Sequence, residues 1–135
     1  IPWATFTHPE VARVGLSETE ANKRGIKFEV TRYRLENLDR AITDEGAFGF
    51  IKVLSPPDSD RILGATIVSD HASDLLAEFV LAMKHNLGLK KILGTIHTYP
   101  TWSEANKYAA GEWRRAHLPY RLLDWVEKYH AWRRG

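Results

Sequence analysis

A proline directly ahead of a helix start, in residues 94–104 (GTIHTYPTWSE), limits the fold more than any other stretch of the chain. Pro100 disfavours a helical Tyr99, whereas Thr101 and Glu104 have the spacing of a capping box that opens a helix. The apolar side of this helix follows at helical spacing, at Trp102, Ala105, Ala109 and Trp113. We therefore expect an abrupt corner at Pro100, where the Tyr99-Pro100 bond is a candidate cis peptide.

The same corner carries three side chains with useful chemistry, which are His97, Tyr99 and Glu104. In an extended segment, residues two apart point the same way, so we expect His97 and Tyr99 to share a face that ends at the helix start. An imidazole, a phenol and a carboxylate gathered there can pass protons or bind a polar ligand. The alternative interpretation is structural, with Pro100 ending one element and the capping box starting the next.

Composition narrows the classes of function. The 135 residues are 44% hydrophobic, which suits one domain with a real core. A net charge of +2 is too small to indicate nucleic acid or membrane binding by itself. The chain has no cysteine, which excludes thiolate metal sites and cysteine nucleophiles within it, and its histidines have no ligand spacing, so no metal site is expected. No apolar run approaches the roughly 20 residues that cross a bilayer, so we expect a cytoplasmic protein. The start at Ile1, without Met, suggests a fragment of a longer polypeptide.

Strand patterns occur in both halves of the chain. Residues 26–30 alternate apolar and polar side chains, which predicts a half-buried strand that ends or bulges at residues 32–35. Residues 48–54 and 61–68 predict an antiparallel hairpin, and Gly64 indicates a bulge or a close backbone approach within it.

Polar stretches separate these strands. The loop between the two hairpin strands, at residues 55–60, is rich in proline and serine. Residues 37–46 are polar and turn-like, and we expect an exposed connection there.

Helical patterns occupy the remaining segments. Ser17 and Glu20 form a second capping box, and Gly25 closes that helix in the left-handed conformation. The stripe in residues 73–83 predicts a core-facing helix that Gly88 ends, and a short helix is expected over residues 89–93. A last helix after Pro119 has two apolar strips, formed by Leu122, Val126 and Tyr129 and by Trp125 and Trp132. It has to cover either this domain or another chain.

The order of strands, helix, strands and then helices predicts an α+β two-layer sandwich. An antiparallel sheet would have helices packed on one face, with a C-terminal helical extension. There is no Gly-x-Gly-x-x-Gly and no P-loop, so nothing in the chain binds a dinucleotide by itself.

Three stretches in this order resemble one family: IPWATFTHPEVARVGLSETEA, RILGATIVSDHASDLLAEFVLAMKHNLGLKKI and HTYPTWSEANKYAA. They are similar to the C-terminal dimerisation domain of the flavoprotein pyridine nucleotide-disulfide oxidoreductases, which include dihydrolipoamide dehydrogenase, glutathione reductase and mercuric reductase. The resemblance covers residues 1–117, the expected dimerisation domain, and leaves residues 118–135 as an amphipathic extension.

The resemblance implies a homodimer and a longer parent protein that binds FAD and NAD(P)H and carries a redox cysteine pair. It also implies a half-site, because a His-Pro-Thr-x-x-Glu segment of the family reaches across the dimer to the partner's flavin and disulfide. Here Tyr99 takes the place of the histidine, Pro100 and Thr101 match, and Glu104 matches the carboxylate that orients the histidine. Tyr99, Pro100 and Thr101 would therefore contact the partner's FAD, and the family's proline at this position is typically cis.

Tyr99 in place of the family's histidine changes the acid–base chemistry that this position can perform. A histidine titrates near pH 6.5 and can shuttle the proton of a dithiol, whereas a tyrosine near pH 10 is a poor base at neutrality. Mercuric reductases resemble this chain in having a tyrosine near this position, but they carry a C-terminal cysteine pair that is absent here. His97 is the alternative acid or base, since some lipoamide dehydrogenases have histidines at both places.

Two hypotheses follow. In the first, the domain completes the active site of an FAD-dependent, NAD(P)H-linked oxidoreductase and is inactive in isolation. In the second, it is a non-catalytic homodimerisation module with a purely structural Tyr-Pro-Thr corner. The substrate and the choice between NADH and NADPH are open at this point.

Overall fold

Five strands form one antiparallel sheet in the order β1-β2-β5-β4-β3, in a computed structural model that describes residues 1–134. The strands are β1 (Trp3–Thr5), β2 (Glu10–Gly15), β3 (Glu29–Arg34), β4 (Phe50–Ser55) and β5 (Gly64–Ser69). The expected hairpin is confirmed, because β4 pairs antiparallel with β5 from Phe50 opposite Val68 to Leu54 opposite Gly64.

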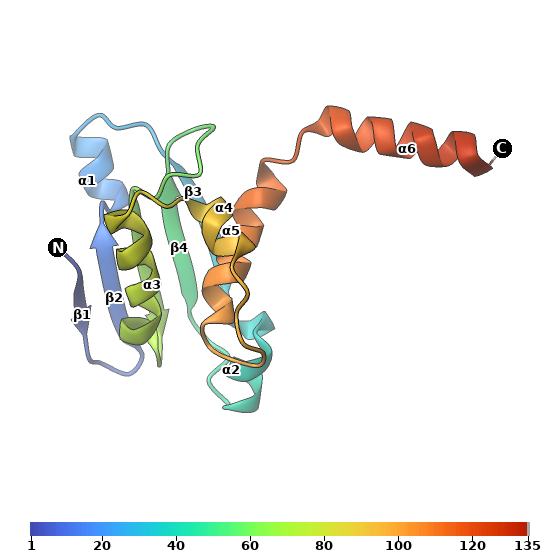
Figure 1. Cartoon of the computed structure of the whole chain (residues 1–135). Coiled ribbons are helices and arrows are strands. Elements are labelled where there is room, and N and C mark those ends of the chain that lie inside the picture. The colour runs from blue at the N-terminus through green and yellow to red at the C-terminus, as the bar shows by residue number, and fades with distance from the viewer. Residues whose placement is uncertain (135) are drawn as a thin grey trace.

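Helices cover one face of this sheet and form the second layer (Figure 1). The helical elements are α1 (Glu18–Lys23), the 3₁₀ turn η1 (Leu35–Asn37), α2 (Asp39–Thr43), α3 (Ala72–Lys84), α4 (Leu89–Gly94), α5 (Glu104–Ala116) and α6 (Tyr120–Arg134). Helix α3 packs on β2 and β5, α5 packs on β3 and β4, and α4 packs on α5. The α+β sandwich is thereby confirmed.

The core lies between the two layers. Alternating strand residues such as Ala12, Ile51 and Ile67 are fully buried, and Phe79 of α3 and Ala109 of α5 meet them from the helical side. The small residues Ala105, Ala109 and Ala110 let α5 approach the sheet closely. Within residues 1–134, no helix combines the length and the apolar character that a membrane crossing requires.

Local signals placed several elements correctly. The Ser17 hydroxyl accepts from the Glu20 amide at 3.2 Å and the Glu20 carboxylate accepts from the Ser17 amide at 2.8 Å, so the first capping box is complete. Gly25 closes that helix with φ of 64°. A Cβ on Gly64 would collide with the carbonyl of Leu16, which confirms the close backbone approach.

Two predictions in the middle of the chain are wrong. The buried face of β3 is formed by Thr31 and Tyr33, whereas Val30, expected inward, is exposed. The segment expected to be an exposed connection folds into η1 and α2 instead, because Leu38 and Ala41 are fully buried in the core.

The end of α3 also differs from expectation, and the last helix leaves the sandwich. Asn86, with φ of 53°, supplies the left-handed residue after α3, and Gly88 is the N-cap of α4 instead of ending α3. Helix α6 projects away from the sandwich and leaves Trp125, Tyr129 and Trp132 exposed (Figure 1). It therefore does not cover this domain. The side chain of Leu122 lies outside the described residues.

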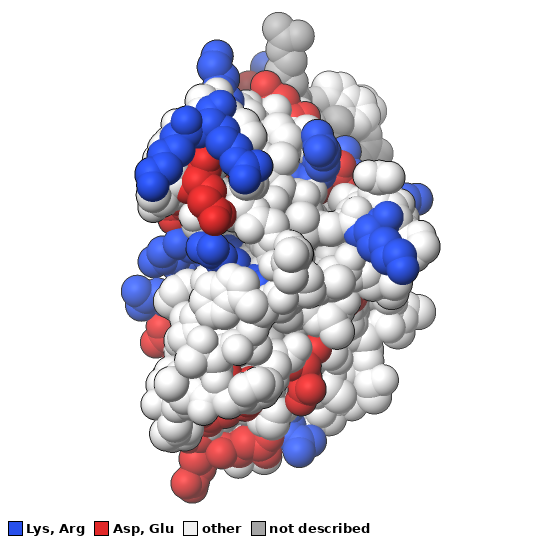
Figure 2. Space-filling model, turned by 90° about the vertical axis from the view of Figure 1, so that its left-hand side faces the viewer, with Lys and Arg blue, Asp and Glu red and all other residues white. Residues whose placement is uncertain are grey.

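The surface on the β1 side has an uneven charge distribution. Figure 2 shows Lys, Arg, Asp and Glu gathered toward its two ends, with a broad stretch between them that carries few charges. The first strand and the segment after it contribute the exposed side chains of Trp3 and Phe6.

Candidate functional site

The corner ahead of α5 is held by hydrogen bonds within residues 98–104, and its Tyr99-Pro100 bond is cis. The Thr101 hydroxyl donates to the carbonyl of Thr98 at 2.5 Å, and the Thr101 amide donates to Glu104 Oε2 at 3.1 Å. Only half of the expected capping box is formed, because the Thr101 hydroxyl turns back to Thr98 instead of accepting from the helix. The helix itself begins at Glu104, after Ser103.

Glu104 lies beneath the corner. Only 6% of its surface is exposed. Its second carboxylate oxygen accepts a long hydrogen bond, 3.5 Å, from the hydroxyl of Tyr108 one turn along α5. This carboxylate therefore fixes the backbone of the corner and does not contact Tyr99 by a hydrogen bond.

Tyr99 projects outward from the corner, with 66% of its surface exposed. Its hydroxyl donates to Asp39 Oδ2 at 2.9 Å, at the start of α2. This bond to Asp39 raises the pKa of the Tyr99 phenol, because a nearby carboxylate disfavours the phenolate. The sequence does not point to Asp39, because it lies 60 residues from Tyr99 and belongs to a helix that the sequence pattern does not predict.

His97 points inward, toward α3. Its side chain is 7% exposed, and its Nε2 lies 2.8 Å from Glu78 Oε1. Its Nδ1 lies 3.0 Å from the carbonyl oxygen of Thr95. His97 and Tyr99 therefore contact different helices, α3 and α2, and the expected shared face is not formed.

Trp102 joins the corner to its surroundings on two sides. Its indole N–H donates to Asp44 Oδ2 at 2.8 Å, just after α2, and its ring lies 4.5 Å from that of His71, just before α3. The hydrogen bonds of Asp44 with Arg40 and Trp102 lower the pKa of its carboxyl group. The corner is thus anchored on both neighbouring helices.

Two further tyrosines lie near the corner. The rings of Tyr33 and Tyr108 are 5.6 Å apart, and together with Asn37 and Glu112 they line a pocket of about 360 Å³. Burial raises the pKa of Tyr33 to about 12. Burial and the neighbouring Glu104 raise the pKa of Tyr108. These phenols are held neutral around a group of carboxylates.

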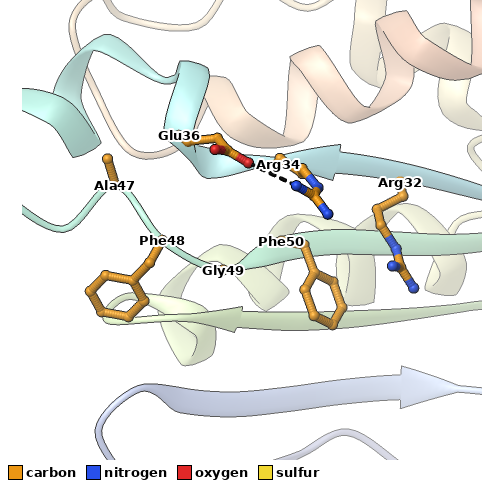
Figure 3. Close-up of a pocket in the computed structure, with 7 residues that line it drawn as sticks. All are labelled: Arg32, Arg34, Glu36, Ala47, Phe48, Gly49 and Phe50. Carbon is orange, nitrogen blue, oxygen red and sulfur yellow. Dashed lines mark hydrogen bonds and ion pairs between the residues drawn. The ribbon is translucent and has the colours of Figure 1, made fainter.

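A separate pocket of about 310 Å³ lies on the sheet face away from the helices (Figure 3). Arg32 stacks over the ring of Phe50 at 4.9 Å, and Arg34 pairs with Glu36 at 3.2 Å. This pocket is lined by none of the predicted site residues, which are His97, Tyr99, Pro100, Thr101 and Glu104. It is therefore distinct from the corner.

Comparison with known proteins agrees with this architecture. Residues 1–110 match the family profile "Pyridine nucleotide-disulphide oxidoreductase, dimerisation domain". The chain is 44% identical over 110 residues to the mitochondrial dihydrolipoyl dehydrogenase of Dictyostelium discoideum, covering 82% of this chain and 22% of the relative. It is 40% identical over 104 residues to the dihydrolipoyl dehydrogenase of Chlamydia muridarum, covering 77% of this chain and 22% of the relative.

Solved structures show the same fold. LpdA from Mycobacterium tuberculosis superimposes with a TM-score of 0.76 at 24% identity, covering 86% of this chain and 25% of that chain. The HOCl-induced flavoprotein disulfide reductase RclA from Escherichia coli gives 0.76 at 22% identity, covering 82% and 26%. This chain thus spans about a quarter of the proteins that it matches. From the profile, the sequence identities and the shared sandwich, the chain belongs to the dimerisation-domain family of the pyridine nucleotide-disulphide oxidoreductases.

Proposed function

We propose that this domain pairs two copies of a longer, FAD-dependent and NAD(P)H-linked oxidoreductase. In that assembly it completes each active site by presenting Tyr99 to the FAD of the partner subunit. The isolated chain is then inactive, because it has no dinucleotide-binding motif and no thiol. We further propose residues 1–117 as the dimerisation domain and residues 118–135 as an extension, since α6 projects from the sandwich.

One observation carries this proposal: the phenol of Tyr99 is exposed, while the corner that holds it is fixed from below by the buried carboxylate of Glu104. Tyr99 is 66% exposed while Glu104 directly beneath the corner is 6% exposed. A tyrosine that only turned the backbone would gain more from burying its ring, since a buried aromatic side chain contributes about 1.5–3 kcal/mol. An exposed aromatic side chain on a rigid corner is instead suited to a surface supplied by another molecule.

The corner fits contact with a flat ring system. Tyr99 and Pro100 are exposed and Thr101 is half-buried, so another molecule can reach all three consecutive residues. When bound, FAD supplies the electron transfer, and these residues of the chain would hold and orient its ring. Tyr99 would add a hydroxyl whose proton can be donated or held.

The protonation state of Tyr99 limits its role. A phenol titrates near pH 10, and the bond to Asp39 raises the pKa of Tyr99 further. At neutral pH the group is therefore a hydrogen-bond donor or an acid and a poor base. His97 is a weaker candidate for the base, because both of its ring nitrogens already contact acceptor oxygens.

The relatives and the side chain at position 99 both bear on the substrate class. The most similar relatives reported above are dihydrolipoyl dehydrogenases, which favours a disulfide or dithiol substrate. The phenol in place of a base fits a metal-bound or non-dithiol substrate such as that of mercuric reductase, but this chain has no cysteine to deliver the metal. We therefore propose a disulfide reductase, located in the cytoplasm. Activity assays of the full-length protein with both substrate classes test the choice of substrate.

The direct test is Tyr99→Phe in the full-length protein. This change removes one hydroxyl and keeps the ring, so we expect kcat to fall on the order of 100-fold, the scale of one acid–base group. The thermal midpoint should change little, because the hydroxyl is exposed. Tyr129→Phe is the matched control, since Tyr129 is also exposed and lies on α6. An unchanged kcat for Tyr99→Phe would reject a chemical role for the phenol.

The non-catalytic dimerisation module is kept as a second candidate, because the Tyr99 hydroxyl already has a partner, Asp39, in its own chain. Under that hypothesis, Tyr99→Phe leaves turnover unchanged, and loss of the exposed hydrogen bond to Asp39 costs the same small amount of stability as under the first hypothesis. Turnover is therefore the measurement that separates the two hypotheses.

A further inference from the structure

A chain of hydrogen bonds runs beneath the corner and connects three elements. His97 Nε2 lies 2.8 Å from Glu78 Oε1 on α3. The other oxygen of Glu78 accepts from Asn106 Nδ2 on α5, also at 2.8 Å. Asn106 Nδ2 donates in addition to the carbonyl of Leu75 on α3, at 2.9 Å. The segment before Tyr99 is thereby tied to both helices that flank it.

The geometry leaves His97 little freedom for proton transfer with a substrate. Both ring nitrogens lie within hydrogen-bond distance of oxygens that only accept, those of Thr95 and Glu78. The side chain is 7% exposed, whereas Tyr99 two residues later is 66% exposed. A general base has to reach the proton that it removes, directly or through one water.

The Asn106 amide has one fixed orientation in this network. The residue is 1% exposed, and its Oδ1 has no hydrogen-bond partner among the described residues. Since its amide nitrogen contacts two acceptors, the amide orientation is fixed by Glu78 and the Leu75 carbonyl. An unpaired buried carbonyl is unfavourable, so the favourable contacts of Asn106 lie on the side that faces Glu78.

We infer that His97 is a positioning residue, and that His97, Glu78 and Asn106 form a strut that sets the conformation of residues 95–101 and hence the direction of Tyr99. This inference rests on the proposed function for its effect on turnover. Its structural part stands alone, because the strut lies within one chain.

The chain offers a matched control. His117 repeats the same pattern at the other end of α5, with Nε2 2.6 Å from Glu29 Oε2 and Nδ1 2.7 Å from the carbonyl oxygen of Trp113. Removing His117 therefore removes a similar pair of contacts, and α5 places it about 20 Å from Glu104, at 1.5 Å per residue.

The first measurement is hydrogen exchange, followed by mass spectrometry, on the full-length protein. The amides of Thr95 and Thr101 are hydrogen-bonded, to Ile92 O and Glu104 Oε2, so exchange at these two amides reports on the order of the segment. His97→Ala and Glu78→Ala should each speed exchange over residues 95–101 about tenfold, the factor for one charge-assisted hydrogen bond. His117→Ala should leave that segment unchanged. Equal exchange in His97→Ala and His117→Ala would overturn the strut.

The second measurement is turnover with its pH profile. His97→Gln keeps a donor that reaches Glu78, so it should recover most of the kcat lost in His97→Ala, with the pH limbs of wild type. The double variant His97→Ala with Glu78→Ala should lose no more than either single variant, since the residues act as one unit. Loss of a pH limb in His97→Gln, with Glu78→Ala near wild type, would make His97 an acid or base and overturn the inference.

The two failures are distinguishable. If Tyr99→Phe keeps full turnover while the exchange results hold, the proposed function is wrong and the strut stands. If Tyr99→Phe loses turnover while exchange over residues 95–101 does not respond to His97→Ala, the strut is wrong and the proposed function stands.

Discussion

Three tyrosines near the corner have raised pKa values, two of them chiefly through burial and Tyr99 chiefly through its hydrogen bond to Asp39. Tyr33 is buried, Tyr99 donates to Asp39, and Tyr108 is partly buried next to Glu104. Each cause disfavours the phenolate, so all three hydroxyls stay protonated well above neutral pH. At the residue scale, the corner is therefore a set of donors facing carboxylates.

Tyr33 gives a prediction about alkaline stability. Its pKa is about 12 in the folded chain against 10.0 for a free phenol. Because the folded state holds the proton more tightly, stability should fall as pH rises from about 10 to about 12, by roughly 2–3 kcal/mol in total. Tyr33→Phe has no proton to lose at this position and should show a smaller alkaline loss.

Urea unfolding of both chains at stepped pH measures this difference. The two curves should run in parallel below the pKa of a free tyrosine and diverge above it. Parallel curves across the whole alkaline range would show that Tyr33 does not titrate abnormally.

Some residues of the corner could be predicted from the sequence and others could not, and the difference depends on how far apart the contacting residues lie along the chain. The exposed tyrosine beside a proline could be anticipated, because Pro100 and Glu104 are local signals. Asp39 could not, since it meets Tyr99 only after β3 and α5 have packed together. His97 was expected on the face of Tyr99 because period-two alternation assumes a straight strand, and the corner is not one.

At the scale of elements, α3 is capped from another part of the sheet. His71, at its N-cap, makes no capping hydrogen bond with its side chain. Instead, the Glu10 carboxylate of β2 accepts from the Ser73 amide at 3.0 Å and from the Ser73 hydroxyl at 2.7 Å. A carboxylate at a helix N-terminus is also favoured by the helix dipole. Helix α3 is therefore fixed to β2.

Glu10→Gln tests this contact. Its hydrogen bonds with Ser73, backbone first, lower the pKa of Glu10 below the usual glutamate range. A lowered pKa stabilises the fold at pH values above the unfolded pKa, and this stability is lost as pH falls through the folded pKa. We expect Glu10→Gln to lower the free energy of unfolding by about 1 kcal/mol at neutral pH.

The difference from wild type should shrink as the pH is lowered through the acidic range, since the wild-type carboxylate then becomes neutral as well. Glu36→Gln is the control, because Glu36 pairs with Arg34 at the surface. A Glu10 difference that is independent of pH would mean that charge contributes nothing to the cap.

Elements with complete local signals were predicted well, and those made by tertiary packing were not. The Ser17 box, the left-handed Gly25 and the stripe of α3 each carry their own determinants within a few residues. The fold of residues 35–43 depends on Leu38 and Ala41 entering a core that other segments build. The face of β3 was misassigned because Thr31 is a polar residue at a buried position.

At the scale of the molecule, the sandwich has a well-packed core but leaves large aromatic side chains exposed on its surface. Tyr99 and the aromatic residues of α6 are exposed, and a broad part of the β1 side carries few charges (Figure 2). Such a distribution is typical of a surface that meets another protein. It agrees with a family whose domain serves in dimerisation.

Self-association follows as a prediction. We expect the 135-residue chain to show the mass of two copies by light scattering as concentration rises, since C2 pairing is the commonest form of homo-oligomer. The same series on a chain ending at residue 117 shows whether α6 takes part. A single-chain mass at the highest concentration for both would argue against pairing through this domain alone.

The most direct measurement for the whole account is complementation between two inactive full-length variants. One carries Tyr99→Phe, and the other has an intact Tyr99 but an inactivated flavin site. If Tyr99 serves the partner's flavin, mixed dimers hold one intact site in two. Random pairing of equal amounts should then restore about a quarter of wild-type activity. If the mixture is as inactive as either variant alone, Tyr99 acts within its own chain, and the shared site is contradicted.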